Sequence, residues 1–366
     1  FNTPKTYAFH AMYLHSHLTS VLKLFIYLIS FFAFLYSQRY ISEREIHQGE
    51  YYILGLFSIL GMIILVSANS LLVLFLSLEL MALPIYAMIA MQRNSGRSSE
   101  AAIKYFVTGG MASGLLLYGI SMLYGMTNSL DINTVAASVM LTPIHQQLLL
   151  IFALVFMVAG IFFKLGAAPF HMWAPDVYEG APTSVTLFLS SAPKVAAFAL
   201  AIRLLVDAMP SSSVEWQQVI IVIALISMAW GNIVAIVQSN LKRMLAYSSI
   251  AHMGYMSLGL IAASNAGYAA AMFYMLVYAI MSLGAFAILT ILSKKGVEVE
   301  NIIDLKGLNS RNPWMALMML LLMFSMAGIP PTAGFFAKLG VLEALVNAHF
   351  IPLAAIALVF AVIGAY

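Results

Sequence analysis

The stretch IFFKLGAAPFHMWAPDVYEGAPTSVTLFLSSAPK, residues 161–194, decides how this chain is organised. It begins in an apolar run, is interrupted at Gly166 and Pro169, and passes through a loop without Lys or Arg into a second apolar run. Each run carries one lysine, Lys164 and Lys194, where a membrane helix would lie inside the bilayer. A lysine at that depth costs at least about 2.5–3.5 kcal/mol on insertion scales. The pattern therefore predicts a polar path across a membrane beside an interrupted helix.

The composition indicates a polytopic membrane protein. Of 366 residues, 63% are hydrophobic and only 8% are charged, whereas a soluble domain carries about 25% charged residues. Cysteine is absent, which excludes cysteine-ligated iron–sulfur clusters, thiolate zinc sites and disulfides in this chain. Because the chain opens on Phe1 and stops inside an apolar run at Tyr366, we expect it to be an internal portion of a longer protein.

Apolar stretches long enough to cross a bilayer, roughly 17–25 residues, predict about eleven transmembrane helices in an all-α fold. The run at 314–346 is too long for one straight span and contains AGIPPTAG, which predicts a second broken helix. The predicted spans are 19–37, 51–68, 70–91, 105–125, 148–168, 184–206, 217–237, 247–263, 268–292, 314–346 and 351–366.

The distribution of basic residues supports this layout. Four loops that alternate to one side, 38–50, 92–104, 238–246 and 293–313, are rich in Lys and Arg, whereas the opposite loops have none. The positive-inside rule places the basic loops in the cytoplasm. Their basic residues are Arg39, Arg44, Arg93, Arg97, Lys104, Lys242, Arg243, Lys294, Lys295, Lys306 and Arg311.

Few ionisable residues remain within the spans. Lys23 and Arg203 lie near span ends, where long side chains can reach the headgroups. Glu79 lies deeper, in LFLSLELMALPIYAMIA, and an acid at that depth is functional by default. The alternative is a protonated carboxyl that is hydrogen-bonded to a neighbouring helix. Pro84 leaves a carbonyl unpaired and can kink the helix, which makes room for a partner or water.

Lys164 and Lys194 are the strongest candidates for a proton path. Pro169 cannot donate to the carbonyl of Leu165, so backbone polarity is released beside Lys164. The alternative is a lysine that only neutralises Glu79 to hold two helices together. Lys194 lies about ten residues into its span, where burial disfavours the ammonium and its charge can respond to neighbours. Its alternative is a constitutively charged structural lysine.

Lys338 and His252 complete the set of deep titratable residues. Lys338 follows the Gly- and Pro-rich break, which predicts water access beside it, and the alternative is snorkelling to the headgroups. His252, in YSSIAHMGY, could pass protons near neutral pH. A histidine at a helix–helix contact, bonded to a serine, is an equally good interpretation.

A possible internal duplication divides the chain. FFKLG at 162–166 resembles FFAKLG at 335–340, and both lie beside a Gly/Pro break. Interrupted helices at matching positions of inverted repeats mark the transport path in many transporters. We therefore predict an N-terminal segment with one span at 1–50, a first five-helix repeat at 51–210 and a second, with its last helix cut short, at 211–366.

Four longer segments resemble the antiporter-like membrane subunits of respiratory complex I. They are SLELMALPIYAMIA (77–90), KLGAAPFHMWAPDVYEGAPTSVTLFLSSAPK (164–194), SNLKRMLAYSSIAHMGY (239–255) and AGIPPTAGFFAK (327–338). Together with the motifs PDVYEGAP and SAPK, these segments resemble the N-type subunit of bacterial NADH–quinone oxidoreductase more than the sister types L and M. The resemblance implies a fourteen-helix fold with two inverted five-helix repeats and two broken helices.

The resemblance also implies a proton channel. The family's functional glutamate falls on Glu79, its lysines fall on Lys164, Lys194 and Lys338, and a further lysine of less defined role falls on Lys104. NADH, flavin, iron–sulfur clusters and quinone would be bound by other subunits. No phosphate-binding glycine loop, paired metal-binding histidines or haem ligand pattern occurs in this chain. The sequence therefore predicts that the chain binds no cofactor or metal of its own.

The resulting hypothesis is proton translocation driven by redox chemistry elsewhere in a large complex of the bacterial inner membrane. The partners would be sister antiporter-like subunits, small membrane subunits and lipid, with no nucleic acid. Glu79 and Lys164 would form the input, and the proton would pass through Lys194 to Lys338 and leave on the non-cytoplasmic face. Two alternatives stay open. One is a subunit of a cation/proton antiporter or membrane-bound hydrogenase, and the other is a scaffold whose buried charges only hold helices together.

Overall fold

The computed structural model describes residues 5–44, 46, 48–141, 147–294 and 297–366, so Lys295 and the first four residues lie outside the described part. In that part, a small antiparallel hairpin precedes a long series of helices. Its strands and first helices are β1 (Thr6–Ala8), β2 (Tyr13–His15), α1 (His17–Glu43), α2 (Gln48–Ser67), α3 (Leu71–Ile89), α4 (Gly96–Thr127), α5 (Ile132–Met140) and α6 (Gln147–Leu165).

The series continues with shorter helices around the two predicted breaks. These are α7 (Trp173–Gly180), α8 (Thr183–Leu189), α9 (Ala192–Ala201), the π-helix η2 (Ile202–Asp207), the 3₁₀-helix η3 (Pro210–Ser212), α10 (Ser213–Ile236), α11 (Leu241–Ile261), α12 (Asn265–Leu292), the 3₁₀-helix η4 (Ile302–Leu305), α13 (Leu308–Arg311), α14 (Pro313–Ala327), α15 (Ala333–Asn347) and α16 (Ile351–Ile363).

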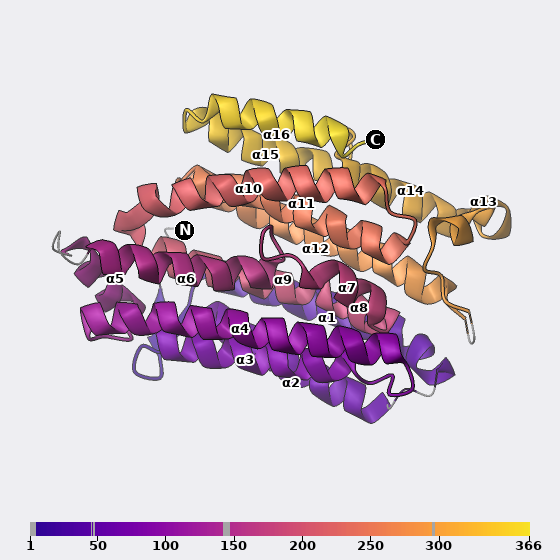
Figure 1. Cartoon of the computed structure of the whole chain (residues 1–366), viewed down its shortest axis with the longest axis horizontal. Coiled ribbons are helices and arrows are strands. Elements are labelled where there is room, and N and C mark those ends of the chain that lie inside the picture. The colour runs from indigo at the N-terminus through magenta and orange to yellow at the C-terminus, as the bar shows by residue number, and fades with distance from the viewer. Residues whose placement is uncertain (1–4, 45, 47, 142–146, 295–296) are drawn as a thin grey trace.

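The long helices run side by side along one direction of the molecule (Figure 1). The helices α2, α3, α4 and α6 gather on one side, and α10, α14, α15 and α16 gather on the other. Eight helical segments of the described residues are long and apolar enough to cross a membrane. With α11 and the shorter apolar helices α14 and α16, they account for the predicted spans.

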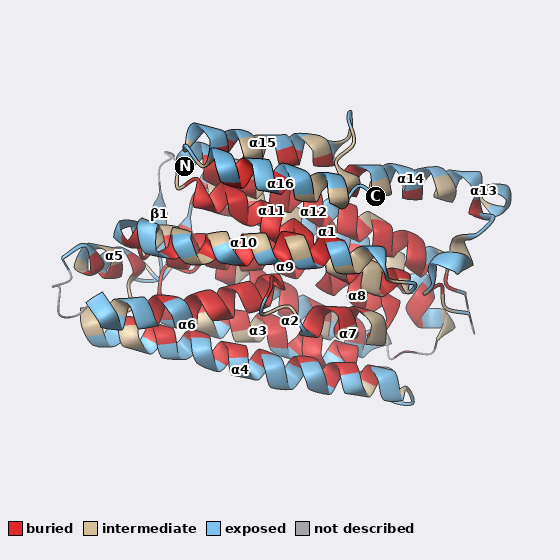
Figure 2. Ribbon diagram, turned by 45° about the horizontal axis from the view of Figure 1, so that its top comes forward, coloured by how far each residue is buried: buried red, intermediate tan, exposed pale blue. Residues whose placement is uncertain are grey.

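The core lies between the two sides. The segment from α8 through η2, Thr183–Asp207, is buried over its whole most apolar stretch, whereas α4 and α10 expose their outer faces (Figure 2). Because lipid is as apolar as a leucine side chain, close backbone approach at small residues drives helix packing. At Gly254 of α11, an added Cβ would lie 2.9 Å from the Ala224 carbonyl oxygen of α10. Such contacts hold α10 against α11.

Both predicted breaks are present, and they are built alike. Gly166 and Gly328 have φ of +76° and +85°, a left-handed conformation that favours glycine. The amide of Gly166 donates to the carbonyl of Phe162 at 2.9 Å, and the amide of Gly328 donates to that of Phe324 at 3.0 Å. The residue after each glycine donates to the same phenylalanine carbonyl. Each half-helix therefore ends in a Schellman cap, which satisfies carbonyls that lipid cannot.

This geometry corrects one argument drawn from the sequence. FFKLG ends α6 just before the first break, whereas FFAKLG lies within α15, after the second break. The two sequence segments are therefore not at equivalent positions. Phe162 and Gly166 of the first break correspond to Phe324 and Gly328 of the second. The breaks still correspond, but on a different register. The division into two repeats stays a prediction.

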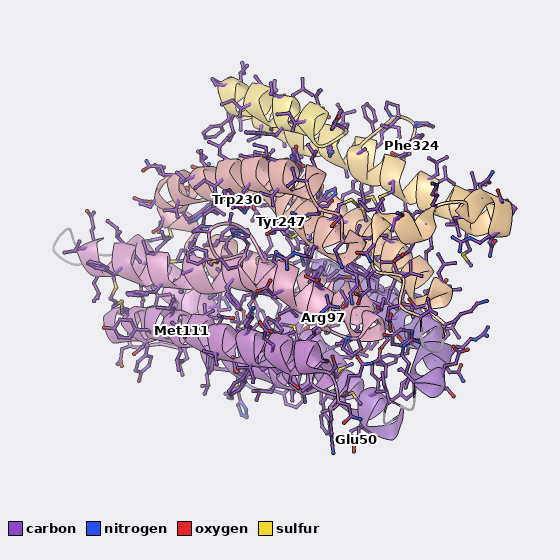
Figure 3. The ribbon with its side chains drawn as sticks, turned by 45° about the vertical axis from the view of Figure 1, so that its right-hand side comes forward. Glu50, Arg97, Met111, Trp230, Tyr247 and Phe324 are labelled. Carbon is purple, nitrogen blue, oxygen red and sulfur yellow. The ribbon has the colours of Figure 1, made fainter. Side chains whose placement is uncertain are left out.

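The structure confirms that the basic loops lie at one end of the molecule, because ion pairs join them. Arg44 of the first loop pairs with Glu298 at 2.7 Å, and Arg97 pairs with Glu300 at 3.3 Å. Arg97 lies near this end of α4, with Met111 farther along the same helix (Figure 3). We call it the cytoplasmic end, following the positive-inside rule.

Candidate functional site: a line of buried lysines

The first part of the site joins α3 to α6 through a tyrosine. Lys164, in the last turn of α6, is only 6% exposed, and its Nζ lies 3.4 Å from the Tyr86 hydroxyl of α3. Glu79 lies two turns before Tyr86 on the same helix, and its Oε1 is buried with no hydrogen-bond partner among the described residues. Tyr86 is therefore the group that Lys164 contacts on the helix of Glu79.

An aromatic cluster separates this pair from the next lysine. Tyr105 of α4 stacks on Trp173 at 4.4 Å between ring centroids, and its ring also packs on Phe163. The indole N–H of Trp173 donates to the Phe163 carbonyl at 3.0 Å, which ties α7 to α6 across the first break. A Cβ added at Gly166 would lie 3.5 Å from Trp173 and 3.9 Å from the Lys194 Nζ. The break thus lies directly between the aromatic cluster and Lys194.

Lys194 lies in the first turn of α9 and is 2% exposed. Its ammonium donates a hydrogen bond to the Ser249 hydroxyl of α11. The rings of Tyr178 and Tyr278 flank it, at 5.8 and 5.2 Å from Nζ to the centroids. Such faces stabilise a buried cation only partly. Among the described residues, no carboxylate forms an ion pair with Lys194, so its hydrogen-bond partner is a neutral hydroxyl.

His252 lies one turn beyond Ser249 on α11 and is 4% exposed. Its Nδ1 is 2.7 Å from the Tyr274 hydroxyl of α12, and its ring lies 5.3 Å from that of Tyr278. His252 thus follows the serine that Lys194 contacts, and it lines the same cavity as Lys338. The partner is a tyrosine where the sequence interpretation had named a serine, and the position between the two lysines suits a proton carrier.

Lys338 is held at the second break. Its ammonium donates to the Ala327 carbonyl at 2.7 Å, at the end of α14, and lies 5.0 Å from the Tyr255 ring centroid. A cation is favoured at the C-terminus of a helix because the last carbonyls are unpaired. Lys338 is 8% exposed, so it does not snorkel to the surface. A cavity of about 390 Å³ borders both Lys338 and His252.

Lys104 belongs to a different group. Its ammonium pairs with Asp176 and with Glu100, both at 2.8 Å, and its side chain is 45% exposed. Asp176 also pairs with Arg243, which in turn pairs with Glu179 of α7. The structure thus places Lys104 in a surface ion cluster around α7 and does not bring it into the line of buried lysines.

The sequence interpretation missed several buried groups. Tyr86, Ser249 and Tyr274 carry no charge, and nothing in the local sequence marks them as partners of a lysine or histidine. The expectation that Arg203 reaches the headgroups is wrong. It is 3% exposed and donates to Asp207 at 2.7 Å and to the Val66 carbonyl at 3.2 Å. The π-turn of η2 places this arginine toward α2 instead of the surface.

Among the described residues, no group of three or more His, Asp or Glu side chains could hold a metal ion. The site is instead a series of single titratable side chains. Lys164, Lys194 and Lys338 are buried near helix breaks or helix ends, His252 is buried within α11, and Glu79 is half-buried within α3. Such an arrangement can bind and release protons at several points across a membrane. It defines the class of polytopic ion-translocating membrane proteins with broken helices.

The chain belongs to the NADH:quinone oxidoreductase/Mrp antiporter transmembrane family, whose sequence profile matches residues 68–364. It is 58% identical over 361 residues to a Coxiella burnetii protein named NADH-quinone oxidoreductase subunit N, covering 99% of this chain and 75% of that protein. A relative with the same name from Thioalkalivibrio sulfidiphilus is 52% identical, with 100% and 76% covered.

Solved structures agree with this assignment. A chain of respiratory complex I from Thermus thermophilus superposes with a TM-score of 0.83 at 34% identity, covering 98% of this chain and 76% of that one. A chain of the Mrp complex from Dietzia also superposes with a TM-score of 0.83, at 22% identity and with 96% and 65% covered. The second match shows the fold alone. The fold and the multi-pass membrane location expected from the sequence are confirmed.

Proposed function

We propose that this chain moves protons across the membrane as the N-type antiporter-like subunit of a bacterial NADH–quinone oxidoreductase. The chain is part of a multi-subunit complex that couples NADH oxidation and quinone reduction to proton translocation. The 58% identity to a subunit N carries this assignment. Electron transfer would take place on other subunits that bind NADH, flavin, iron–sulfur clusters and quinone, and the partners of this chain would be sister antiporter-like subunits and small membrane subunits.

The proposed path begins at Glu79 and Lys164. Lys164 contacts Tyr86 on the helix of Glu79, and the Oε1 atom of Glu79 has no hydrogen-bond partner among the described residues. When Glu79 approaches, it holds the ammonium charged, and when it withdraws, burial favours release of the proton. The proton then passes toward Lys194 and, by way of His252, toward Lys338, which releases it to the non-cytoplasmic side. A charge that crosses 100 mV carries about 2.3 kcal/mol, which a redox reaction can supply.

The test is Lys164→Ala in the assembled complex, in inverted membrane vesicles supplied with NADH. We expect both quinone reduction and proton uptake to fall at least about tenfold, because coupled pumping cannot bypass an interrupted path. Lys306→Ala is the control, since Lys306 is an exposed lysine of a cytoplasmic loop. An assembled Lys164→Ala complex that pumps normally contradicts the proposed path.

The alternatives predict other outcomes. A scaffold of buried charges predicts that lysine variants lose assembly, whereas a proton path predicts complexes that assemble and fail to pump. A cation/proton antiporter predicts sodium- or potassium-dependent proton movement without NADH. Co-purification of this chain with an NADH- and quinone-reactive complex distinguishes a complex I subunit from a cation/proton antiporter.

A further inference from the structure

An uncharged side chain, Ser249, lies beside Lys194 on the helix that carries His252. Lys194 lies on α9 and His252 on α11, and the hydroxyl of Ser249 is the group on α11 that accepts the hydrogen bond from Lys194. Ser249 is 1% exposed, so no bulk water competes for it. We propose that Ser249 is a relay residue that carries the proton between Lys194 and His252, an inference that rests on the proposed function.

Helix geometry supports this role. Ser249 and His252 are three residues apart on α11, so their side chains lie on the same face and one turn apart. The ring of Tyr278, from α12, lies 5.2 Å from the Lys194 ammonium and 5.3 Å from the His252 ring. The same aromatic surface thus covers both ends of the step. No direct Ser249–His252 hydrogen bond is formed in this conformation, so the step uses rotation of the hydroxyl or one intervening water.

The proton balance is simple. A serine hydroxyl has one proton to donate and lone pairs that accept. The Lys194 ammonium gives a proton to Ser249 Oγ while the hydroxyl gives its own proton to the imidazole of His252. Lys194 becomes a neutral amine, His252 becomes imidazolium, and the serine is regenerated. Nδ1 of His252 lies 2.7 Å from the Tyr274 hydroxyl, so the proposed accepting atom is Nε2. In that tautomer Nδ1–H donates a hydrogen bond to the Tyr274 oxygen, which positions the ring.

An anchoring role for Ser249 makes a different prediction. A serine that only fills the space beside Lys194 could be replaced by any group of the same shape. Thr and Val have nearly the same shape and differ by a hydroxyl against a methyl. A comparison of these two variants therefore isolates the contribution of the hydroxyl, and it remains informative when Ser249→Ala leaves a cavity and assembles poorly.

The experiment measures proton uptake per NADH oxidised in inverted vesicles containing the assembled complex, in H₂O and in D₂O. We expect Ser249→Thr to pump within about twofold of wild type, and Ser249→Ala and Ser249→Val to lose about tenfold or more, as for removal of a proton-transfer group. In Ser249→Thr the solvent isotope effect should be as in wild type.

Ser257→Ala is the matched control, because Ser257 is an equally buried serine of α11 whose hydroxyl donates to the Met253 carbonyl of its own helix, at 2.7 Å. It should pump normally. Normal pumping by assembled Ser249→Val overturns the proposal, and so does equal loss in Ser249→Thr and Ser249→Val, since the hydroxyl then makes no difference. Lys194→Ala separates failure of the serine relay from failure of the proposed proton path. If it abolishes pumping while Ser249→Val does not, only the relay fails, whereas normal pumping by Lys194→Ala removes the proposed path itself.

Discussion

At the scale of single residues, the position of the Tyr86 side chain depends on a glycine, Gly109, on the neighbouring helix α4. Its hydroxyl contacts Lys164. A Cβ added at Gly109 of α4 would overlap that hydroxyl and lie 2.9 Å from the ring carbon that bears it. Gly109 therefore keeps open the space in which Tyr86 meets the lysine.

Gly109→Ala should displace Tyr86 and weaken its contact with Lys164. We expect proton uptake driven by NADH to fall several-fold, whereas Gly110→Ala should behave as wild type because nothing lies within 4 Å of a Cβ there. Both changes raise helix propensity by about 1 kcal/mol, so the pair is matched in that respect. Vesicle pumping assays of the two variants check this.

A double-mutant cycle makes the same prediction stricter. If Gly109→Ala acts by displacing the Tyr86 hydroxyl, then adding it to Tyr86→Phe should change pumping little further, because the displaced group is already gone. Independent, additive losses from the two substitutions would show that Gly109 matters for another reason.

At the scale of elements, α7 is held in place by charges at the cytoplasmic end. Asp176 pairs with Lys104 and Arg243, Glu179 pairs with Arg97 and Arg243, and Lys242 donates to the Ala181 carbonyl at 2.9 Å, just after the helix ends. The helix has only eight residues, too few to be stable alone in water. These pairs therefore fix the helix that follows the first break and carries Tyr178 against Lys194.

Asp176→Asn should loosen α7 and lower the temperature at which NADH-driven quinone reduction is lost. Partial burial opposes ionisation of Asp176, but hydrogen bonds from Lys104 and Arg243 outweigh it and hold the pKa of this carboxyl below its ordinary value. Its ion pairs therefore stabilise the protein above about pH 4, the ordinary range of an aspartate, and are lost as pH falls through the lower pKa of the folded state.

The drop caused by Asp176→Asn should accordingly be the same at pH 6 and pH 8, and small, since exposed ion pairs contribute about 1 kcal/mol or less each. Glu50→Gln, at an exposed carboxylate in the first turn of α2, should leave the inactivation temperature unchanged. A drop present at pH 8 and absent at pH 6 would mean that Asp176 titrates in that interval, against the expectation.

At the scale of the whole molecule, the orientation of the helices can be read with cysteine labels, because the chain has no cysteine of its own. Asn94, in the loop before α4, and Ala137, on α5, are both exposed and lie at opposite ends of the bundle. A membrane-impermeant maleimide should label Asn94→Cys in inverted vesicles and Ala137→Cys only from the opposite face. Labelling of both from one side contradicts the topology.

Much of this architecture is predictable from the sequence because hydrocarbon imposes simple constraints. Length and hydropathy locate the spans, and basic residues indicate the sides. Gly and Pro mark the breaks, and Lys164, Lys194 and Lys338 stand out because charge is so costly there. The partners of these lysines were not predictable. Ser249 is 55 residues from Lys194 along the chain, and which hydroxyl faces which ammonium depends on helix rotation and packing, which single-sequence patterns do not contain.

The second break has a mechanical consequence. Two hydrogen bonds join its halves: the amide of Gly334 donates to the Ser325 hydroxyl at 3.0 Å, and Lys338 donates to the Ala327 carbonyl. These bonds hold α14 and α15 in one relative orientation, and a change in that orientation would break at least one of them. A displacement of one helix is therefore expected to move the other, and Lys338 lies at the junction between them.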